Sequence, residues 1–298
     1  MRPEQRGAAV VMAMLVVALS VLLVSAALHR QNVLTRQVEN EVAAAQTRWL
    51  LLGAVDWVRV ILREDARSSG ADHLGEPWAV PLRPTRLDND GGDPAWLSGA
   101  VEDAQARFNL RNVSGPTGLA PSEVAVLERL VEMVGADRML AERLALRVDA
   151  AVSVRHATEG GVLVAPATLD ELSIDDPAQR TALQRLRPFV TLLPAPTPVN
   201  VNTAPAEVLA ARFENLSLAD ARRLVASRER AYFRDVNDLL SRVPGVRPAG
   251  SMGQIAFGTQ HFFVRGNLEF RRARLQALVL LKREGGRVSV VWTREQTI

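Results

Sequence analysis

The chain contains no cysteine, which excludes disulfides, thiol catalysis and cysteine-based zinc sites together. Aromatic residues make up only 5% of its 298 residues, so we expect hydrophobic cores of leucine, valine and alanine. Lysine is nearly absent as well, because Lys282 is the single lysine among 36 basic residues. Arginine does not titrate near neutrality, so a net charge of only +3 accompanies an isoelectric point of 10.3. This small excess predicts no strong attraction for nucleic acid.

Catalytic motifs are also missing. The four histidines, His29, His73, His156 and His261, are scattered without the spacing of metal ligands. The sequence has no HExxH, P-loop or GxSxG motif. Asp72 beside His73 is typical of a turn rather than of a catalytic dyad. We therefore predict that the protein is not an enzyme and name no catalytic residue.

A long apolar run lies near the amino terminus. Residues 8–28 carry no charge, and two serines are their only polar residues. As a helix this run spans about 31 Å at about 1.5 Å per residue, which is enough to cross the hydrocarbon core of a bilayer. The short leader 1–7 carries Arg2 and Arg6 against Glu4, and the positive-inside rule therefore places it in the cytoplasm.

The alternative to a membrane anchor is a secretory signal peptide. Val24-Ser25-Ala26 has the small residues of a signal-peptidase site, which would release the protein after Ala26. The apolar run is, however, longer than the core of an ordinary signal peptide, and it continues as an amphipathic helical pattern. We therefore predict a retained transmembrane helix over 8–28 and its periplasmic continuation over 29–67.

Gly7 stands between the basic leader and the apolar run, and Ala8 follows it. This arrangement resembles the type IV prepilin signal, in which prepilin peptidase cuts after the glycine and the apolar helix stays on the mature protein. The resemblance implies cleavage between Gly7 and Ala8, and it allows N-methylation of Ala8. Most proteins with this signal carry a glutamate at the fifth mature position, which here is Met12.

The rest of the chain divides by its turn chemistry and its hydrophobic period. Residues 68–99 are rich in Gly, Pro and Asp, and 88–93 read as a β-turn because they lack the ligand spacing of a calcium loop. Residues 100–110 read as a strand that enters a loop. Helical periodicity predicts helices over 121–134, 137–152, 167–172, 177–186, 217–228 and 233–242.

Prolines and caps mark the remaining boundaries. Pro194, Pro196 and Pro198 predict a stiff connector. Thr203 is predicted to cap the next helix, with Pro205 in its first turn. Alternation between glycine turns predicts strands over 260–264, 266–272, 273–283 and 288–293.

This order of elements predicts an α+β fold. A long amino-terminal transmembrane helix leads into a pilin-like α/β domain with an antiparallel sheet, and an all-α domain with helix-hairpin-helix or SAM-like helices is inserted into it. We predict the following segments: leader 1–7, transmembrane helix 8–28, helix continuation 29–67, first part of the α/β domain 68–112, inserted helices 113–250 in two subdomains (113–193 and 194–250), and closing strands 251–298.

The chain resembles the K-type minor pseudopilins of the type II secretion system. The resemblance covers nearly the whole chain and rests on short pieces in a fixed order. These are residues 6–8 with the apolar run, 72–78, 102–103, 107–110 with Asn112, 198–204, 262–266 and 272–275. K-type members also lack a glutamate at the fifth mature position, in agreement with Met12.

The resemblance implies a function in assembly. A K-type protein sits at the tip of a short periplasmic pseudopilus with the I-type and J-type minor pseudopilins, and the H-type and major pseudopilins are further expected partners. It starts assembly and limits pseudopilus length during export of folded proteins across the outer membrane. The implied location is the bacterial inner membrane, with a single span, a cytoplasmic amino terminus and a periplasmic globular part.

Two further expectations concern ligands. The resemblance implies calcium bound by acidic loop residues, for which Asp149 and Glu159 are the candidates here. Residues 200–240 also resemble a helix-hairpin-helix module, so a membrane-anchored DNA-binding protein of the competence type is the alternative function. The turn at 214–218 has no glycine and carries Glu214, which would repel a phosphate, so we predict no nucleic-acid partner.

Overall fold

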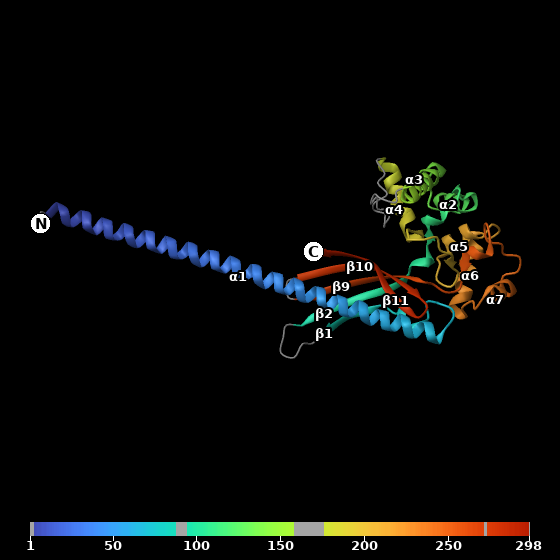
Figure 1. Ribbon diagram of the computed structural model, residues 1–298, viewed down its shortest axis with the longest axis horizontal. Coiled ribbons are helices and arrows are strands. Elements are labelled where there is room, and N and C mark those ends of the chain that lie inside the picture. The colour runs from blue at the N-terminus through green and yellow to red at the C-terminus, as the bar shows by residue number, and fades with distance from the viewer. Residues whose placement is uncertain (1–2, 88–93, 158–175, 271–272, 298) are drawn as a thin grey trace.

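The computed structural model describes residues 3–87, 94–157, 176–270 and 273–297. Its first element, α1 (Pro3–Ser68), is a single helix of 66 residues. Figure 1 shows α1 as a rod whose first part extends away from the rest of the molecule and whose second part lies along a sheet. The predicted run of helix through 8–67 is confirmed, and Gly53 does not interrupt it.

The sheet has five antiparallel strands in the order β1-β2-β9-β10-β11. Side chains on β9 alternate between buried and exposed along most of its length, as expected for a sheet with one covered face. The strands are β1 (Leu82–Leu87), β2 (Ala95–Asp103), β9 (His261–Phe270), β10 (Ala273–Glu284) and β11 (Arg287–Thr297).

The second half of α1 covers one face of this sheet. Val55 and Leu62 pack with Phe262 and Val279 in one of the hydrophobic clusters between helix and sheet. The helix comes very close at Gly266, where an added Cβ would lie 3.1 Å from Leu51 Cδ1. A glycine at this point therefore allows the close contact between helix and strand.

The helical part of the molecule lies between β2 and β9 in the sequence, although these two strands are neighbours in the sheet. It forms the largest hydrophobic core, built mostly of leucine, valine and alanine as the composition predicts. Its helices are α2 (Pro121–Met133), α3 (Arg138–Ala157), α4 (Pro177–Leu186), α5 (Ala206–Arg212), α6 (Leu218–Arg230) and α7 (Val236–Arg242).

Short elements connect the sheet to these helices. Two short parallel pairs, β3 with β6 and β7 with β8, join segments that are far apart in the sequence. The short strands are β3 (Phe108–Asn109), β4 (Ser114–Gly115), β5 (Gly118–Leu119), β6 (Val190–Thr191), β7 (Val199–Asn200) and β8 (Ile255–Ala256). The 3-10 turns are η1 (Pro77–Ala79), η2 (Ala104–Ala106), η3 (Leu110–Val113), η5 (Arg187–Phe189) and η6 (Met252–Gln254).

The structure corrects several sequence predictions. The two strands predicted on either side of residue 265 are the single strand β9, because Gly266 pairs within the sheet instead of forming a turn. The turn-rich region 68–99 contains β1 and the start of β2. Thr203 does not cap α5, whose N-cap position is Pro205. The predictions for 167–172 and 88–93 lie outside the described residues.

Candidate functional site on the amino-terminal helix and at the sheet–helix junction

The first part of α1 exposes its apolar side chains. Between residues 10 and 28 the large hydrophobic side chains are exposed by 53% to 69%. Within the described residues, α1 is the helix long and apolar enough to cross a membrane, with a mean hydropathy of 2.8 over its most apolar window. Gly7 and Ala8 lie near its start, and the side chain of Met12 is 63% exposed. This surface is uncovered in the isolated chain and has the composition of a membrane span.

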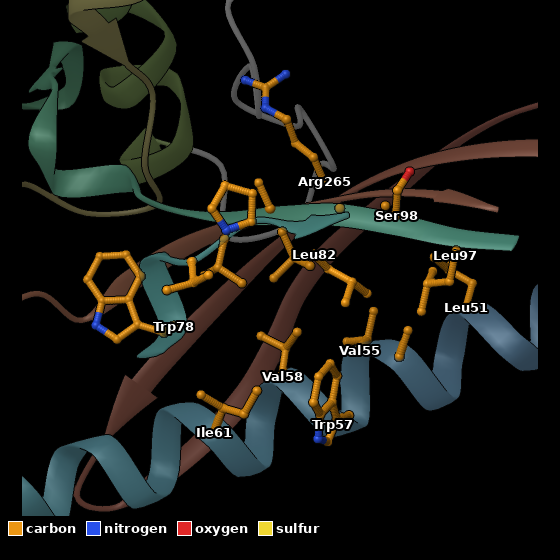
Figure 2. A pocket seen from close by; sticks show the side chains of 18 of the residues that line it. Leu51, Val55, Trp57, Val58, Ile61, Trp78, Leu82, Leu97, Ser98 and Arg265 are labelled. Carbon is orange, nitrogen blue, oxygen red and sulfur yellow. The ribbon is translucent and has the colours of Figure 1, made fainter. Parts of the chain in front are cut away.

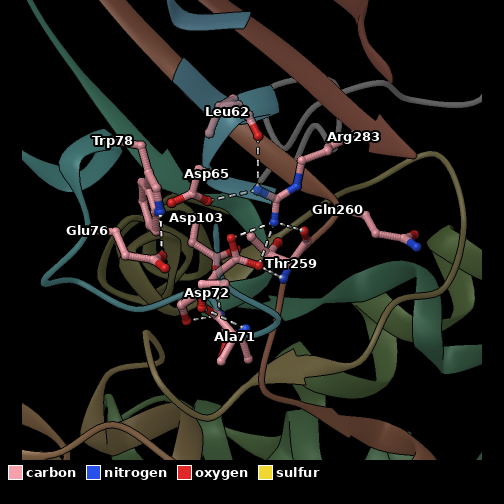
Figure 3. A network of polar contacts seen from close by, with 12 residues as sticks. Leu62, Asp65, Ala71, Asp72, Glu76, Trp78, Asp103, Thr259, Gln260 and Arg283 are labelled. Carbon is pink, nitrogen blue, oxygen red and sulfur yellow. Dashed lines mark hydrogen bonds and ion pairs between the residues drawn. The ribbon is translucent and has the colours of Figure 1, made fainter. Parts of the chain in front are cut away.

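A buried polar junction forms at the other end of α1 (Figure 3). Its centre is Arg283 on β10, whose guanidinium donates to Asp65 Oδ2 at 2.9 Å and to both Asp72 carboxylate oxygens at 2.5 and 2.6 Å. It also donates to the backbone oxygens of Leu62 and Thr259. One side chain therefore joins the end of α1, the following loop and the strand β10.

Three carboxylates share this junction. Oxygens of Asp65, Asp72 and Glu76 lie within 4.8 Å of one another, and all three residues are buried. Burial raises the pKa of Asp65 to about 6, and the neighbouring Glu76 carboxylate adds to the rise. Arg283 already supplies a cation to this group, and Glu76 accepts from Trp78 Nε1 at 2.8 Å. The arrangement is that of an internal ion-pair network rather than of an open metal site.

A second part of the junction holds the helical region to the sheet. Asp103, at the end of β2, accepts hydrogen bonds from Asn200 Nδ2 at 2.8 Å and Thr203 Oγ1 at 2.5 Å. Asn200 also donates to the backbone oxygen of Asp72. Burial raises the pKa of Asp103, while the hydrogen bonds from Thr203 and Asn200 act in the opposite direction. The hydroxyl of Thr203 therefore makes a tertiary contact instead of capping α5.

Asparagine side chains clamp the segments that lead to this contact. Asn109 Nδ2 donates to Ala195 O at 2.8 Å, and Asn112 Nδ2 donates to Thr197 O at 2.8 Å. These bonds fix the proline-rich connector against the residues that follow β2. Asn202 exchanges two hydrogen bonds with the backbone of Phe233, so the loop before α7 is fixed in the same way.

Four of the short sequence pieces on which the resemblance rests therefore meet at one buried place. Asp72, Asp103, Asn112 and Asn200 come from separate pieces and all contribute to the junction or to its clamps. Sequence reasoning missed the central cation, Arg283, because a charged residue in an alternating strand reads as solvent-exposed.

An apolar groove with a volume of about 350 Å³ opens between α1 and the sheet (Figure 2). Val55, Val58 and Ile61 of α1 point towards it, and Leu82 and Leu97 line its far side. Trp57 stands at its α1 edge and is 54% exposed. The lining carries no cluster of titratable groups, so the groove offers apolar contacts rather than chemistry.

The described residues do not form a calcium site at Asp149. Asp149 Oδ1 accepts a hydrogen bond from Ser114 Oγ at 2.6 Å, and within the described part of the chain no other acid is grouped with it. Calcium takes six to eight oxygen ligands, which one carboxylate cannot supply. The second candidate, Glu159, lies outside the described residues.

The turn at 214–218, where a DNA-binding module would approach a phosphate, is used inside the protein. The backbone N–H of Glu214 donates to Arg247 O. The Asn215 side chain donates to Gly245 O at 2.6 Å and accepts from the backbone N–H of Arg247 at 3.1 Å. The turn therefore packs against the loop after α7.

A long helix with a bare apolar first half, whose second half packs on an antiparallel sheet, defines a membrane-anchored protein of the pilin-like class. In this chain a helical region lies between β2 and β9 in the sequence, although these two strands are neighbours in the sheet.

Comparison with known proteins specifies the family. The model of the family described as type II secretion system (T2SS), protein K matches residues 199–257. Type II secretion system protein K of Klebsiella pneumoniae is 30% identical over 323 residues, which cover 99% of this chain and 97% of that protein. The Pseudomonas aeruginosa protein of the same name is 29% identical over 314 residues, covering 98% and 93%. The chain belongs to the type II secretion system protein K family.

A solved structure shares the fold. The crystal structure of the GspK-GspI-GspJ complex from the type 2 secretion system of enterotoxigenic Escherichia coli contains a chain that matches with a TM-score of 0.69 at 21% identity. The match covers 87% of this chain and 99% of that chain. The K-type resemblance and the α+β fold predicted from the sequence are thereby confirmed.

Proposed function

We propose that this member of the protein K family is the minor pseudopilin at the tip of a type II secretion pseudopilus, where it starts assembly and limits length. The observation that carries the proposal is the combination, on one helix, of an uncovered apolar surface and a fifth mature position without an acid. The role is one of assembly, in keeping with the secretion-system proteins that the chain is similar to.

Met12 supports the end position. In pilin-like proteins the usual glutamate at this place pairs with the amino terminus of a neighbouring subunit that is already in the filament. A subunit that begins the filament has no earlier neighbour to meet. The exposed thioether of Met12 cannot form such an ion pair, so this chain is suited to the first position and not to the ones that follow.

The position of the helices supports the same conclusion. In Figure 1 the helices α2–α7 lie at the end of the molecule that is remote from the amino terminus of α1. A subunit stacked beyond this end would have to pass its own helix through the space that they occupy. The helical region therefore favours a cap, and a cap that cannot be extended limits length.

The proposed partners follow from this position. We expect contacts with I-type and J-type minor pseudopilins, the two companions named with GspK in the solved complex, and further down with H-type and major pseudopilins. We propose that the span 8–28 crosses the bacterial inner membrane, with its amino terminus in the cytoplasm and the head in the periplasm. Prepilin peptidase is proposed to cut between Gly7 and Ala8.

Co-production of the full-length chain with the I-type and J-type proteins and the prepilin peptidase of the same bacterium tests the proposal. After extraction in mild detergent, an affinity tag on this chain should recover both partners. Antibody against the chain should label overproduced pseudopili at one end only. Labelling along the filament, or recovery of the chain without either partner, would contradict the proposed position.

A further inference from the structure

The loop that follows α1 touches both the sheet and the helical region. This junction loop, residues 69–76, lies between α1 and η1 in the sequence. Asp72 O accepts a hydrogen bond from the Asn200 side chain at 3.0 Å. The His73 ring stacks on the ring of Tyr232, between α6 and α7, with 4.1 Å between the ring centroids. A change that loosens the junction loop therefore loosens the connection between α1 and the helical region.

The charges at the base of this loop do not balance (Figure 3). The buried carboxylates of Asp65, Asp72 and Glu76 share the single guanidinium of Arg283. With every group ionised, three negative charges would stand against one positive charge, which leaves a net charge of −2 away from water. Like charges in a buried place disfavour full ionisation, so a proton taken up by one of the acids stabilises the group.

Asp65 is the acid that accepts this proton most readily. Asp72 accepts from Arg283 with both carboxylate oxygens and from a backbone N–H at 2.6 Å. Glu76 accepts from a backbone N–H at 2.9 Å and from an indole N–H at 2.8 Å. These hydrogen bonds favour the charged forms of both acids. Within the described residues, the Asp65 carboxylate accepts from Arg283 alone.

Other titratable groups near Asp65 come from the same helix, from the loop and from the end of β2. On α1, Glu64 pairs with Arg67 at the surface. On the loop, His73 Nε2 lies 3.8 Å from a carboxylate oxygen of the cluster and can also change its charge. Asp103, at the end of β2, accepts two side-chain hydrogen bonds of its own. A test of the proton on Asp65 must therefore separate it from His73.

We propose that the junction loop is a proton-controlled joint between α1 and the rest of the head. With a proton on Asp65, the loop holds the end of α1 firmly to the sheet and to the helical region. Without this proton, the loop opens locally and reversibly while the sheet and the helices stay folded. The joint belongs to the chain by itself and needs no partner subunit, so it goes beyond the proposed function.

The size of the effect follows from linkage. Opening of the loop exposes Asp65 to water and returns its pKa from about 6 to the ordinary value of 3.8. The stabilisation by the proton is then complete below pH 3.8 and is lost as the pH rises through about 6. Each unit of pKa shift is a factor of ten, so the loop should open about tenfold more often at pH 7.5 than at pH 5.

Hydrogen exchange of the full-length chain in mild detergent tests the joint, after correction for the intrinsic effect of pH on exchange. The reporters are the backbone N–H groups of Asp72 and Thr259, which are hydrogen-bonded within the junction. Their protection should be about tenfold lower at pH 7.5 than at pH 5. Asp65→Asn should keep it high at both pH values. Glu64→Gln, a matched change at an exposed neighbouring position, should behave like the wild type.

Two further variants and urea locate the effect. His73→Phe keeps a ring against Tyr232 but cannot titrate, so the pH dependence should remain. Glu76→Gln removes one of the three negative charges and should make the difference between the two pH values smaller. Urea at about 1 M should speed exchange in β9 and not in the loop, because a local opening exposes little surface.

Several results would overturn the joint. Equal protection of the reporters at the two pH values would show that no proton controls the loop. Retention of the pH dependence in Asp65→Asn, or its loss in His73→Phe, would assign the effect to another group. Exchange in the loop that urea speeds as much as in β9 would mean that pH acts on the whole fold.

Discussion

Replacement of Arg283 by methionine removes the single cation shared by the buried carboxylates at the end of α1. The substitution keeps a long apolar side chain but leaves Asp65 and Asp72 without their ion pairs, at 2.9 and 2.5 Å. Loss of one partner from a buried ion pair costs about 3–5 kcal/mol, so we expect the free energy of unfolding to fall by about 4 kcal/mol at pH 7.5.

The pH dependence of this loss distinguishes charge from packing. Without Arg283 the buried acids take up protons more readily, and the pKa of Asp65 is already raised to about 6. At pH 5 protonation therefore removes part of the unpaired negative charge. Because each unit of pKa shift corresponds to about 1.4 kcal/mol, we expect the loss in free energy of unfolding to shrink to about 2 kcal/mol at this pH.

Urea unfolding of the full-length chain in mild detergent, followed by tryptophan fluorescence, measures this difference. Arg265→Met on the neighbouring strand is the control, because Arg265 is 54% exposed and its ion pair with Glu102 lies at the surface. We expect the control to cost less than about 1 kcal/mol. An equal loss for Arg283→Met at both pH values, or one no larger than the control's, would refute the electrostatic reasoning.

Three further predictions concern buried ionisable side chains and use the same unfolding assay. Arg212→Ala should cost about 3–5 kcal/mol, because Arg212 and Glu123 form a fully buried bidentate pair, whereas Glu123→Leu combined with Arg212→Met should cost far less. Asp65 stabilises the fold fully below pH 3.8 and loses this contribution as the pH rises through about 6. Because Arg283 keeps its ion pair with Asp72 when Asp65 is replaced, Asp65→Asn should gain about 3 kcal/mol over wild type at pH 7.5 and little at pH 4. Burial lowers the pKa of His261 to about 4, so its contribution is present above pH 6.5 and lost as the pH falls through 4, and His261→Asn should remove this acid limb.

Local signals in the sequence were sufficient for most helices. The charge-free run and the helical spacing after it predicted α1, and Asp176 before Pro177 marks the start of α4, which runs from 177 to 186 as predicted. Such signals depend on residues within a few positions of one another. They are strong where the element is long or where its cap is supplied by the adjacent residue.

Contacts between distant residues account for the errors. Thr203 has the side chain of an N-cap, but Asp103, a hundred residues earlier, takes its hydroxyl hydrogen bond. Gly266 reads as a turn, although it pairs with both neighbouring strands within β9 and leaves room for α1 to approach the sheet there. Strand β1 carries Pro84 and lacks apolar alternation, so only its pairing with β2 reveals it. Apart from Asp65, the acids and amides of the junction lie in the motif pieces, but no local pattern joined them to Arg283.

The mass of the mature chain most directly tests the claim that the apolar helix stays on the protein and assembles it into the pseudopilus. Full-length chain co-produced with prepilin peptidase should be recovered from membranes beginning at Ala8, and Gly7→Val should leave it uncut. A soluble chain beginning at Ala27 would contradict the account, because the surface on which assembly depends would have been removed.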